Sequence, residues 1–275
     1  MKYLNIGCGY HFSNNEQWVN LDFISTGKNV IAHNLIKGIP FENNSFDLVY
    51  HSHVLEHFSK EEGEKLISEC FRVLKQGGVL RISVPDLEKI ARNYLKFLEE
   101  GLNFPDHEGI TANYNWMLLE MYDQTVRNIN GGNMAKYLFQ DTITNENFVM
   151  ERLGEEGKSL RNFFLQSKKN ISPEHNAKSE SMLGRMKNYI KKYVFKKLKV
   201  DEQALSIGKF RLGGEIHQWM YDRYSLSTLL KNNGGMNIIV RDAFTSYDLT
   251  WKSHNLDQNN GLVRKPDSLF MEAIK

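Results

Sequence analysis

Residues 3–9 read Tyr-Leu-Asn-Ile-Gly-Cys-Gly, an apolar strand that runs directly into a glycine turn. The next apolar run, Trp18–Leu21, ends at Asp22. Glycine lets the backbone approach a ligand closely, and an acid at the end of the neighbouring strand accepts hydrogen bonds from two ribose hydroxyls. Gly7, Gly9 and Asp22 therefore predict a site for a nucleoside-bearing cofactor. The alternative is an ordinary tight turn before a buried strand.

The glycine turn does not fit a dinucleotide site. The dinucleotide pattern Gly-x-Gly-x-x-Gly places its third glycine where this chain has Phe12. Its acid follows the turn after about 20 residues, but Asp22 comes sooner. A cofactor without a phosphate does not need the helix N-terminus that binds a pyrophosphate. Ser13 and Glu16 have the spacing of a capping box, which indicates that a short helix remains between the two strands.

Further segments follow this turn in a characteristic order. They are His33-Asn34-Leu35, Ile39-Pro40-Phe41, residues 44–50 (Asn-Ser-Phe-Asp-Leu-Val-Tyr), residues 53–58 (His-Val-Leu-Glu-His-Phe) and residues 72–80 (Arg-Val-Leu-Lys-Gln-Gly-Gly-Val-Leu). Residues 3–86 thus resemble the class I S-adenosylmethionine-dependent methyltransferases of the branch called type 11. The resemblance implies an α/β, Rossmann-like fold: a mostly parallel seven-stranded sheet with helices on both faces and an inserted helical cap. It also implies S-adenosylmethionine as the cofactor.

The resemblance assigns cofactor binding to residues at the ends of the first strands. These residues are Asn5, Gly7, Gly9, Asp22, Asn34, Leu35, His51 and His53. The chain departs from the family at Asn5 and Asn34, where an acid is usual, and near His11, where a third glycine is usual. An asparagine amide still donates to and accepts from an adenine edge. The loss of two acids weakens the attraction for a positively charged sulfonium.

Two later segments resemble a bacterial subgroup that is associated with surface-polysaccharide gene clusters. They are residues 217–226 (His-Gln-Trp-Met-Tyr-Asp-Arg-Tyr-Ser-Leu) and residues 265–272 (Lys-Pro-Asp-Ser-Leu-Phe-Met-Glu). This resemblance implies O-methylation of a sugar or glycan intermediate of surface-polysaccharide synthesis. The alternatives are a methyltransferase of another small molecule and a non-catalytic binding protein that retains the fold. The departures at Asn5 and Asn34 keep the last alternative open.

A neutral sugar hydroxyl is a poor nucleophile, so its methylation benefits from a general base. His53 follows the fourth predicted strand, at the edge where open parallel sheets bind ligands, and is a predicted catalytic residue. His57 comes four residues later, and its alternative is a helix residue with no catalytic role. Asp86 is a further candidate base, although a helix N-cap explains it better. No acid–histidine group has metal-site spacing, so no metal is predicted.

His217 is the second predicted catalytic residue, and it precedes a run rich in aromatic and charged side chains. Aromatic faces stack on sugars, and polar tips bind hydroxyl groups. Tyr221 and Arg223 therefore join His217 as predicted substrate-binding residues. The alternative is that Trp219 and Tyr221 only cover the sheet, with Asp222 and Arg223 at the start of a helix.

The length of 275 residues, with 41% apolar and 25% charged residues, is that of a globular enzyme. We expect residues 1–99 to form the cofactor-binding part of the core, 100–215 an inserted helical cap and 216–275 the rest of the core. Cys8 and Cys70 give no metal spacing and no expected disulfide, which favours a reducing cytoplasm. The N-terminal strand leaves no room for a signal peptide, and no apolar run reaches the roughly 20 residues that span a bilayer.

The formal net charge of +2 is unevenly distributed. Residues 181–200 hold seven Lys or Arg and no acid, which leaves 28 basic against 33 acidic residues elsewhere. Apolar side chains at positions 183, 186, 190, 194 and 198 lie on one face of a helix. A basic amphipathic helix binds an anionic membrane surface; the alternative is a solvated basic face on a helix that packs against the core. Nucleic acid is not a predicted partner, because the basic residues are confined to one segment.

Overall fold

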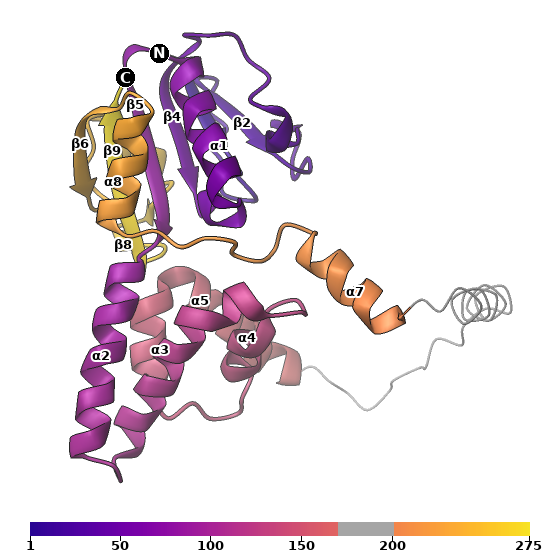
Figure 1. Cartoon of the computed structure of the whole chain (residues 1–275), viewed down its shortest axis with the longest axis vertical. Helices are drawn as coiled ribbons and strands as arrows, with labels where there is room; N and C mark the ends of the chain where they lie inside the picture. The colour runs from indigo at the N-terminus through magenta and orange to yellow at the C-terminus, as the bar shows by residue number, and fades with distance from the viewer. Residues whose placement is uncertain (170–200) are drawn as a thin grey trace, which may run out of the picture.

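The computed structural model describes residues 1–169 and 201–275, and its centre is a seven-stranded sheet of order β3-β2-β1-β4-β5-β9-β6 (Figure 1). The strands are β1 (Tyr3–Ile6), β2 (Trp18–Asp22), β3 (Val30–Ala32), β4 (Phe46–Ser52), β5 (Leu74–Pro85), β6 (Met236–Arg241) and β9 (Ser268–Ile274). The first five strands are parallel, and β9 runs antiparallel between β5 and β6. This arrangement confirms the predicted Rossmann-like, mostly parallel sheet.

Two helices cover one face of the sheet, α1 (Lys60–Val73) and α8 (Arg223–Asn232). Alternate strand residues such as Leu4, Ile6 and Val49 point to this face, because successive side chains in a strand alternate in direction. Leu66, Ile67, Cys70 and Phe71 of α1 and Leu226 and Leu230 of α8 pack on them. A capping box of Ser59 and Glu62 fixes the start of α1.

The opposite face has a different cover. Residues 7–17 contain no helix, so the short helix predicted from Ser13 and Glu16 is wrong. Residues 242–267 lie over this face instead, with the short helix α9 (Trp251–His254) and the hairpin β7 (Gln258–Asn259) and β8 (Leu262–Val263). Trp251 and Leu256 from this segment pack on Tyr3, Trp18, Leu48 and Tyr50. Residues 242–267 therefore cover the part of the sheet that a helix between β1 and β2 would otherwise cover.

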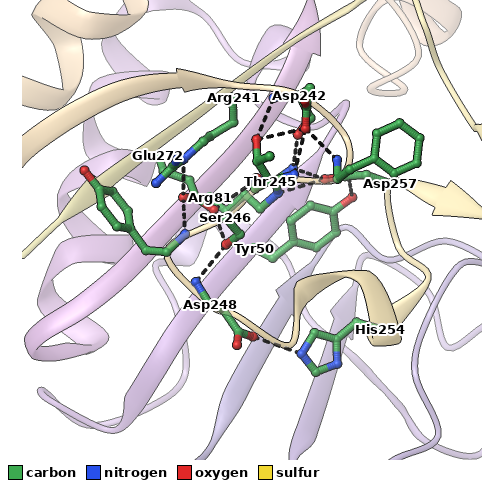
Figure 2. A network of polar contacts seen from close by, with 12 residues as sticks. Tyr50, Arg81, Arg241, Asp242, Thr245, Ser246, Asp248, His254, Asp257 and Glu272 are labelled. Atoms are coloured by element: carbon green, nitrogen blue, oxygen red, sulfur yellow. Dashed lines mark hydrogen bonds and ion pairs between the residues drawn. The ribbon is translucent and has the colours of Figure 1, made fainter.

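Buried charges hold this covering segment on the sheet (Figure 2). Arg81 of β5 is fully buried and pairs with Asp257 at 2.7 Å and with Glu272 at 2.9 Å. It also donates to the carbonyl oxygens of Thr245 at 2.8 Å and Asp242 at 2.7 Å. A buried charge is stable only when it is paired and hydrogen-bonded, and this guanidinium meets both conditions.

An inserted helical region follows β5 (Figure 1). Its helices are α2 (Leu87–Asn103), α3 (Glu108–Val126), α4 (Gly132–Leu138), α5 (Glu146–Lys169) and, after the gap, α7 (Glu202–Arg211). Buried Trp116 and Met117 of α3 and Val149 of α5 form a second core. Ile90 and Phe97 of α2 belong to it, so α2 packs with the insertion. Asp86 is the N-cap of α2 and accepts from the amide of Lys89.

Among the described helices, none has the length and apolarity that a membrane crossing requires. The basic segment 181–200, for which we predicted membrane contact, lies outside the described residues. In Figure 1, helices α2, α3, α4 and α5 lie below the sheet.

Candidate active site

Two cavities lie where the parallel strands end. The first, of about 410 Å³, is lined by the glycine turn, by the ends of β4 and β5 and by α5. The second, of about 400 Å³, lies between the sheet and the helical insertion, and Gln124, Arg127, Met134, His217 and Met220 are in its lining. His53, Glu156, Leu160 and Lys265 line both cavities. The two cavities therefore meet at a shared wall.

The glycine turn lines the first cavity through Asn5, Gly7 and Gly9. Gly7 has φ +63°, and an added Cβ would lie 2.2 Å from Val54 Cγ2, so no other residue fits there. Gly9 has φ +51°, and an added Cβ would meet no protein atom within 4 Å. The backbone at Gly9 is thus open to close approach by a ligand, which fits the predicted cofactor.

Asp22 is tied to the same turn. Its carboxylate accepts from the amide of Gly9 at 2.8 Å and from the amide of Ile24 at 3.3 Å. Each carboxylate oxygen has more than one acceptor position, so both retain capacity for ribose hydroxyls. Asp22 lies beside the first cavity's glycine turn rather than among its lining residues.

Three other predicted cofactor residues line neither cavity. Asn34 caps the 3₁₀ helix η1 (Leu35–Lys37), where its side chain accepts from the amide of Ile36 at 3.0 Å. Leu35 packs against the apolar core. His51 is fully buried on the α1 side of the sheet, and burial lowers its pKa to about 4. Neither of its ring nitrogens has a hydrogen-bond partner among the residues that the structure describes.

His53 lies at the shared wall, immediately after β4. Its φ of +54° is unusual for a side-chain-bearing residue and costs on the order of 1–3 kcal/mol, which the surrounding contacts offset. Nδ1 lies 3.2 Å from Glu56 Oε1, and Nε2 lies 2.8 Å from the hydroxyl oxygen of Ser268. The side chain remains 14% exposed and lines both cavities.

Glu56 is the centre of a histidine cluster. It lies in the 3₁₀ helix η2 (Leu55–His57), is fully buried, and is contacted by His53 and His217. Within the described part of the chain, neither carboxylate oxygen has a partner that meets hydrogen-bond geometry. Burial alone would raise the pKa of this carboxyl, but His53, His217 and His57 lower it to about 2.

His217 joins this cluster from a distant part of the chain. Its amide donates to the carbonyl oxygen of Gln124 at 3.0 Å, which holds it at the insertion. Nε2 lies 4.0 Å from Glu56 Oε1, and the ring packs edge-on against His57, with ring centroids 4.8 Å apart. Burial lowers the pKa of His217 to about 3, so its imidazole is neutral at neutral pH.

Residues 11–82 match the family model Methyltransf_11, which is described as a methyltransferase domain. The match spans 72 of the 275 residues and shows that this part of the chain is similar to a methyltransferase domain. It begins two residues after Gly9, includes Asp22 and the segment from His53 to His57, and stops before the insertion. No curated protein matches the chain.

Solved structures with a similar fold include two that align over 100% of this chain. One is a SAM-dependent methyltransferase from Archaeoglobus fulgidus, at 14% identity, 86% coverage of that chain and a TM-score of 0.38. The other is a SAM-dependent methyltransferase from Thermotoga maritima, at 9% identity, 82% coverage and a TM-score of 0.37. A third, from a complex with a Haloferax volcanii methyltransferase activator, matches 33% of this chain and 47% of its own, at 15% identity and a TM-score of 0.27.

Two predicted substrate-binding residues line neither of the two cavities. Tyr221 is buried in the apolar core, where its hydroxyl lies over Gly63. Arg223 is exposed and pairs with Glu88 at 2.8 Å. His217 is thus separated from both of them, although all three are close in sequence.

Glu56 is the residue that sequence reasoning missed. The position of this acid between His53 and His57 is the sequence feature that could have indicated a polar cluster. Spacing alone does not show that the carboxylate is buried or that His217 completes its surroundings.

Proposed function

We propose that this protein transfers a methyl group from S-adenosylmethionine to a hydroxyl group of a sugar or glycan intermediate of bacterial surface polysaccharide. The observation that supports the proposal is the pair of cavities with a shared wall. The first cavity has the glycine turn and suits the cofactor, and the second suits the acceptor. Such an arrangement aligns two reactants, and positioning of this kind is worth about 7–11 kcal/mol in favourable cases.

Asn5, Gly7 and Gly9 would hold the cofactor through backbone and amide groups, and Asp22 would accept from its ribose hydroxyls. When bound, S-adenosylmethionine supplies a methyl group on a positively charged sulfonium, which a nucleophile displaces directly. Glu156 lies at the shared wall, 2.7 Å from Lys265. Burial alone would raise the pKa of Glu156, but Lys265 holds it below its usual value, so the carboxylate stays ionised. Its charge is compensated by Lys265, so this ion pair adds no net charge to the shared wall.

His53 is our proposed general base. Nδ1 of His53 lies 3.2 Å from the Glu56 carboxylate, outside hydrogen-bond geometry, and the negative charge there favours the tautomer that carries its proton on Nδ1; we therefore assign Nε2 as the basic atom. Ser268 donates to Nε2 in the free protein. We assign to Nε2 the proton of the acceptor hydroxyl, once that hydroxyl takes the place of Ser268.

The acceptor class rests on the two segments that resemble the polysaccharide subgroup. Both segments contribute to the second cavity, 217–226 through His217 and Met220 and 265–272 through Lys265 and Asp267. Arg127 and Glu120 add charged groups to the lining. The proposal makes no use of Tyr221 and Arg223, because they line neither cavity.

Titration calorimetry with S-adenosylmethionine and S-adenosylhomocysteine is the first test. We expect both to bind the wild-type protein and neither to bind Asp22→Ala, while Asp106→Ala, an exposed acid far from the turn, binds as the wild type does. Failure of the wild type to bind would favour the non-catalytic alternative.

Transfer of a labelled methyl group to a panel of sugars and lipid-linked glycans is the second test. We expect His53→Gln to lower turnover by about 100-fold or more, because it removes the general base. Labelling only of non-sugar small molecules would replace the proposed acceptor class. Unchanged turnover of His53→Gln would reject the role of His53.

A further inference from the structure

We propose that Glu56, His57 and His217 form a binding site for one divalent transition-metal cation, best suited to Zn²⁺. The sequence did not predict it, because no spacing along the chain shows these three side chains together. The structure brings one ligand atom from each residue to within 4.8 Å of the others. Of the three residues, His217 lines the second cavity, and Glu56 is buried behind it.

The distances between these three ligand atoms fit coordination of one cation better than direct hydrogen bonds between the side chains. Nε2 of His217 lies 4.0 Å from Oε1 of Glu56, too far for a hydrogen bond. Zinc bonds to imidazole and carboxylate of about 2.0–2.2 Å place tetrahedral ligand atoms roughly 3.3 Å apart. A small movement of side chains therefore closes the three residues around one ion.

The tautomer of His57 is already set for a ligand. Its Nδ1 lies 3.2 Å from the carbonyl oxygen of Ile216. A carbonyl oxygen only accepts, so Nδ1 carries the proton and Nε2 keeps its lone pair. A hydrogen bond from the second ring nitrogen to a carbonyl is the usual support of a metal-binding histidine.

The segments that carry the ligands are fastened to each other. The amide of Gln218 donates to the carbonyl oxygen of Glu56 at 2.7 Å, and the side chain of Gln218 donates to the carbonyl oxygen of His57 at 2.8 Å. The amide of His217 donates to Gln124. His217 is therefore held beside η2 by backbone contacts that do not depend on a metal.

The carboxylate of Glu56 is a second and independent sign of a missing cation. It is fully buried, and neither oxygen has a hydrogen-bond partner within residues 1–169 and 201–275. Among the residues that the structure describes, its ion-pair contacts are with histidines and with no Lys or Arg. An ionised carboxylate in such surroundings is costly unless a cation compensates it. The other possible compensation is a proton on a histidine, which the experiment below distinguishes from a metal.

Two imidazoles and one carboxylate suit Zn²⁺ and similar ions, whereas Mg²⁺ and Ca²⁺ prefer sets of oxygen ligands. Three protein ligands leave a fourth position open, as in catalytic zinc sites. If the second cavity holds the acceptor, the ion can bind the acceptor hydroxyl and lower its pKa. This last consequence rests on the proposed function, but cation binding itself does not.

The test is titration of chelator-treated protein with Co²⁺ followed by its visible absorption, and with Zn²⁺ in competition. We expect one Co²⁺ per chain, displaced by Zn²⁺, and no thiolate charge-transfer band because Cys8 and Cys70 are not ligands. Glu56→Gln and His217→Ala should each weaken binding at least 10-fold. His107→Asn, which changes a histidine at the start of α3 to another capping residue, should bind as the wild type does.

His57→Ala provides a variant at a half-buried position, in case the two buried changes unfold the chain; folding is checked by circular dichroism. A folded His57→Ala protein with lost Co²⁺ binding supports the site. Absence of binding in the wild type, or binding that none of the three changes weakens, overturns it and leaves a histidine proton as the compensating charge. The titration needs neither S-adenosylmethionine nor acceptor, so its failure is separate from failure of the proposed function.

Discussion

The two faces of the sheet are covered in opposite ways. On one face, α1 and α8 lay apolar side chains on apolar strand residues, and the contacts are those of an ordinary core. On the other, residues 242–267 contribute few regular elements and are held by Arg81, Asp257 and Glu272. Apolar packing by α1 and α8 is non-directional and tolerates small changes. The ion pairs that hold residues 242–267 need Arg81, Asp257 and Glu272 to be present together.

The largest expected effect is that of Arg81→Met. The change leaves Asp257 and Glu272 buried without their partner, so we expect the free energy of unfolding to fall by about 3–5 kcal/mol. Urea denaturation measures it. Arg92→Met, which removes an exposed pair with Glu88, is the matched control and should cost about 0–1 kcal/mol. Equal losses in both variants would show that the second cover does not depend on buried charge.

Tyr50→Phe tests the same cover more gently. The Tyr50 hydroxyl donates to Asp257 at 2.6 Å, and loss of a hydrogen bond to a charged group costs about 1.5–3 kcal/mol. Tyr50 and Asp257 also line the first cavity. We therefore expect calorimetry to show weaker S-adenosylmethionine binding as well. An unchanged affinity would show that the contact between Tyr50 and residues 242–267 does not contribute to cofactor binding.

Ile67→Val samples the helix-covered face. Ile67 is fully buried in α1, and loss of one methylene from a core costs about 0.5–1.5 kcal/mol. Ile67 does not line the first cavity, so the cofactor affinity of this variant should match that of the wild type. A fall in affinity as large as that of Tyr50→Phe would contradict the inference that the face covered by residues 242–267, and not the helix-covered face, supports the cofactor site.

Arg223→Gln should have the smallest effect. Its pair with Glu88 is exposed, so stability should change by less than about 1 kcal/mol. Turnover in the methyl-transfer assay should equal that of the wild type, since Arg223 lines neither cavity. A loss of turnover with normal stability would restore Arg223 as a substrate-binding residue.

The helix-covered face was predictable because its signals are local. Ser59 and Glu62 announce a helix start, and the apolar spacing of Leu66, Ile67 and Cys70 gives its buried side. The glycine turn was predictable for the same reason, since a turn and the strands beside it lie within a short stretch of chain.

The other face and the histidine cluster were not predictable, because their signals are distant pairings. The sequence around Arg81 is that of an exposed strand residue, and only the fold shows its pairing with Asp257. The sequence around Glu56 is that of a helix residue, and only the fold places His217 beside it. Asn34 and His51 were assigned to the cofactor by family position and stay predictions; the structure places a helix cap at the first and a buried ring at the second.

The wall of the first cavity is built from segments that the ribosome produces far apart in time. The glycine turn emerges early, but Leu256, Asp257, Arg264 and Lys265 complete the same cavity much later. The lining of the first cavity is therefore complete only once residues 256–270 have been made. A ligand bound in this cavity contacts early and late segments at once, and it stabilises the folded chain that holds them together in proportion to ln(1 + [L]/Kd).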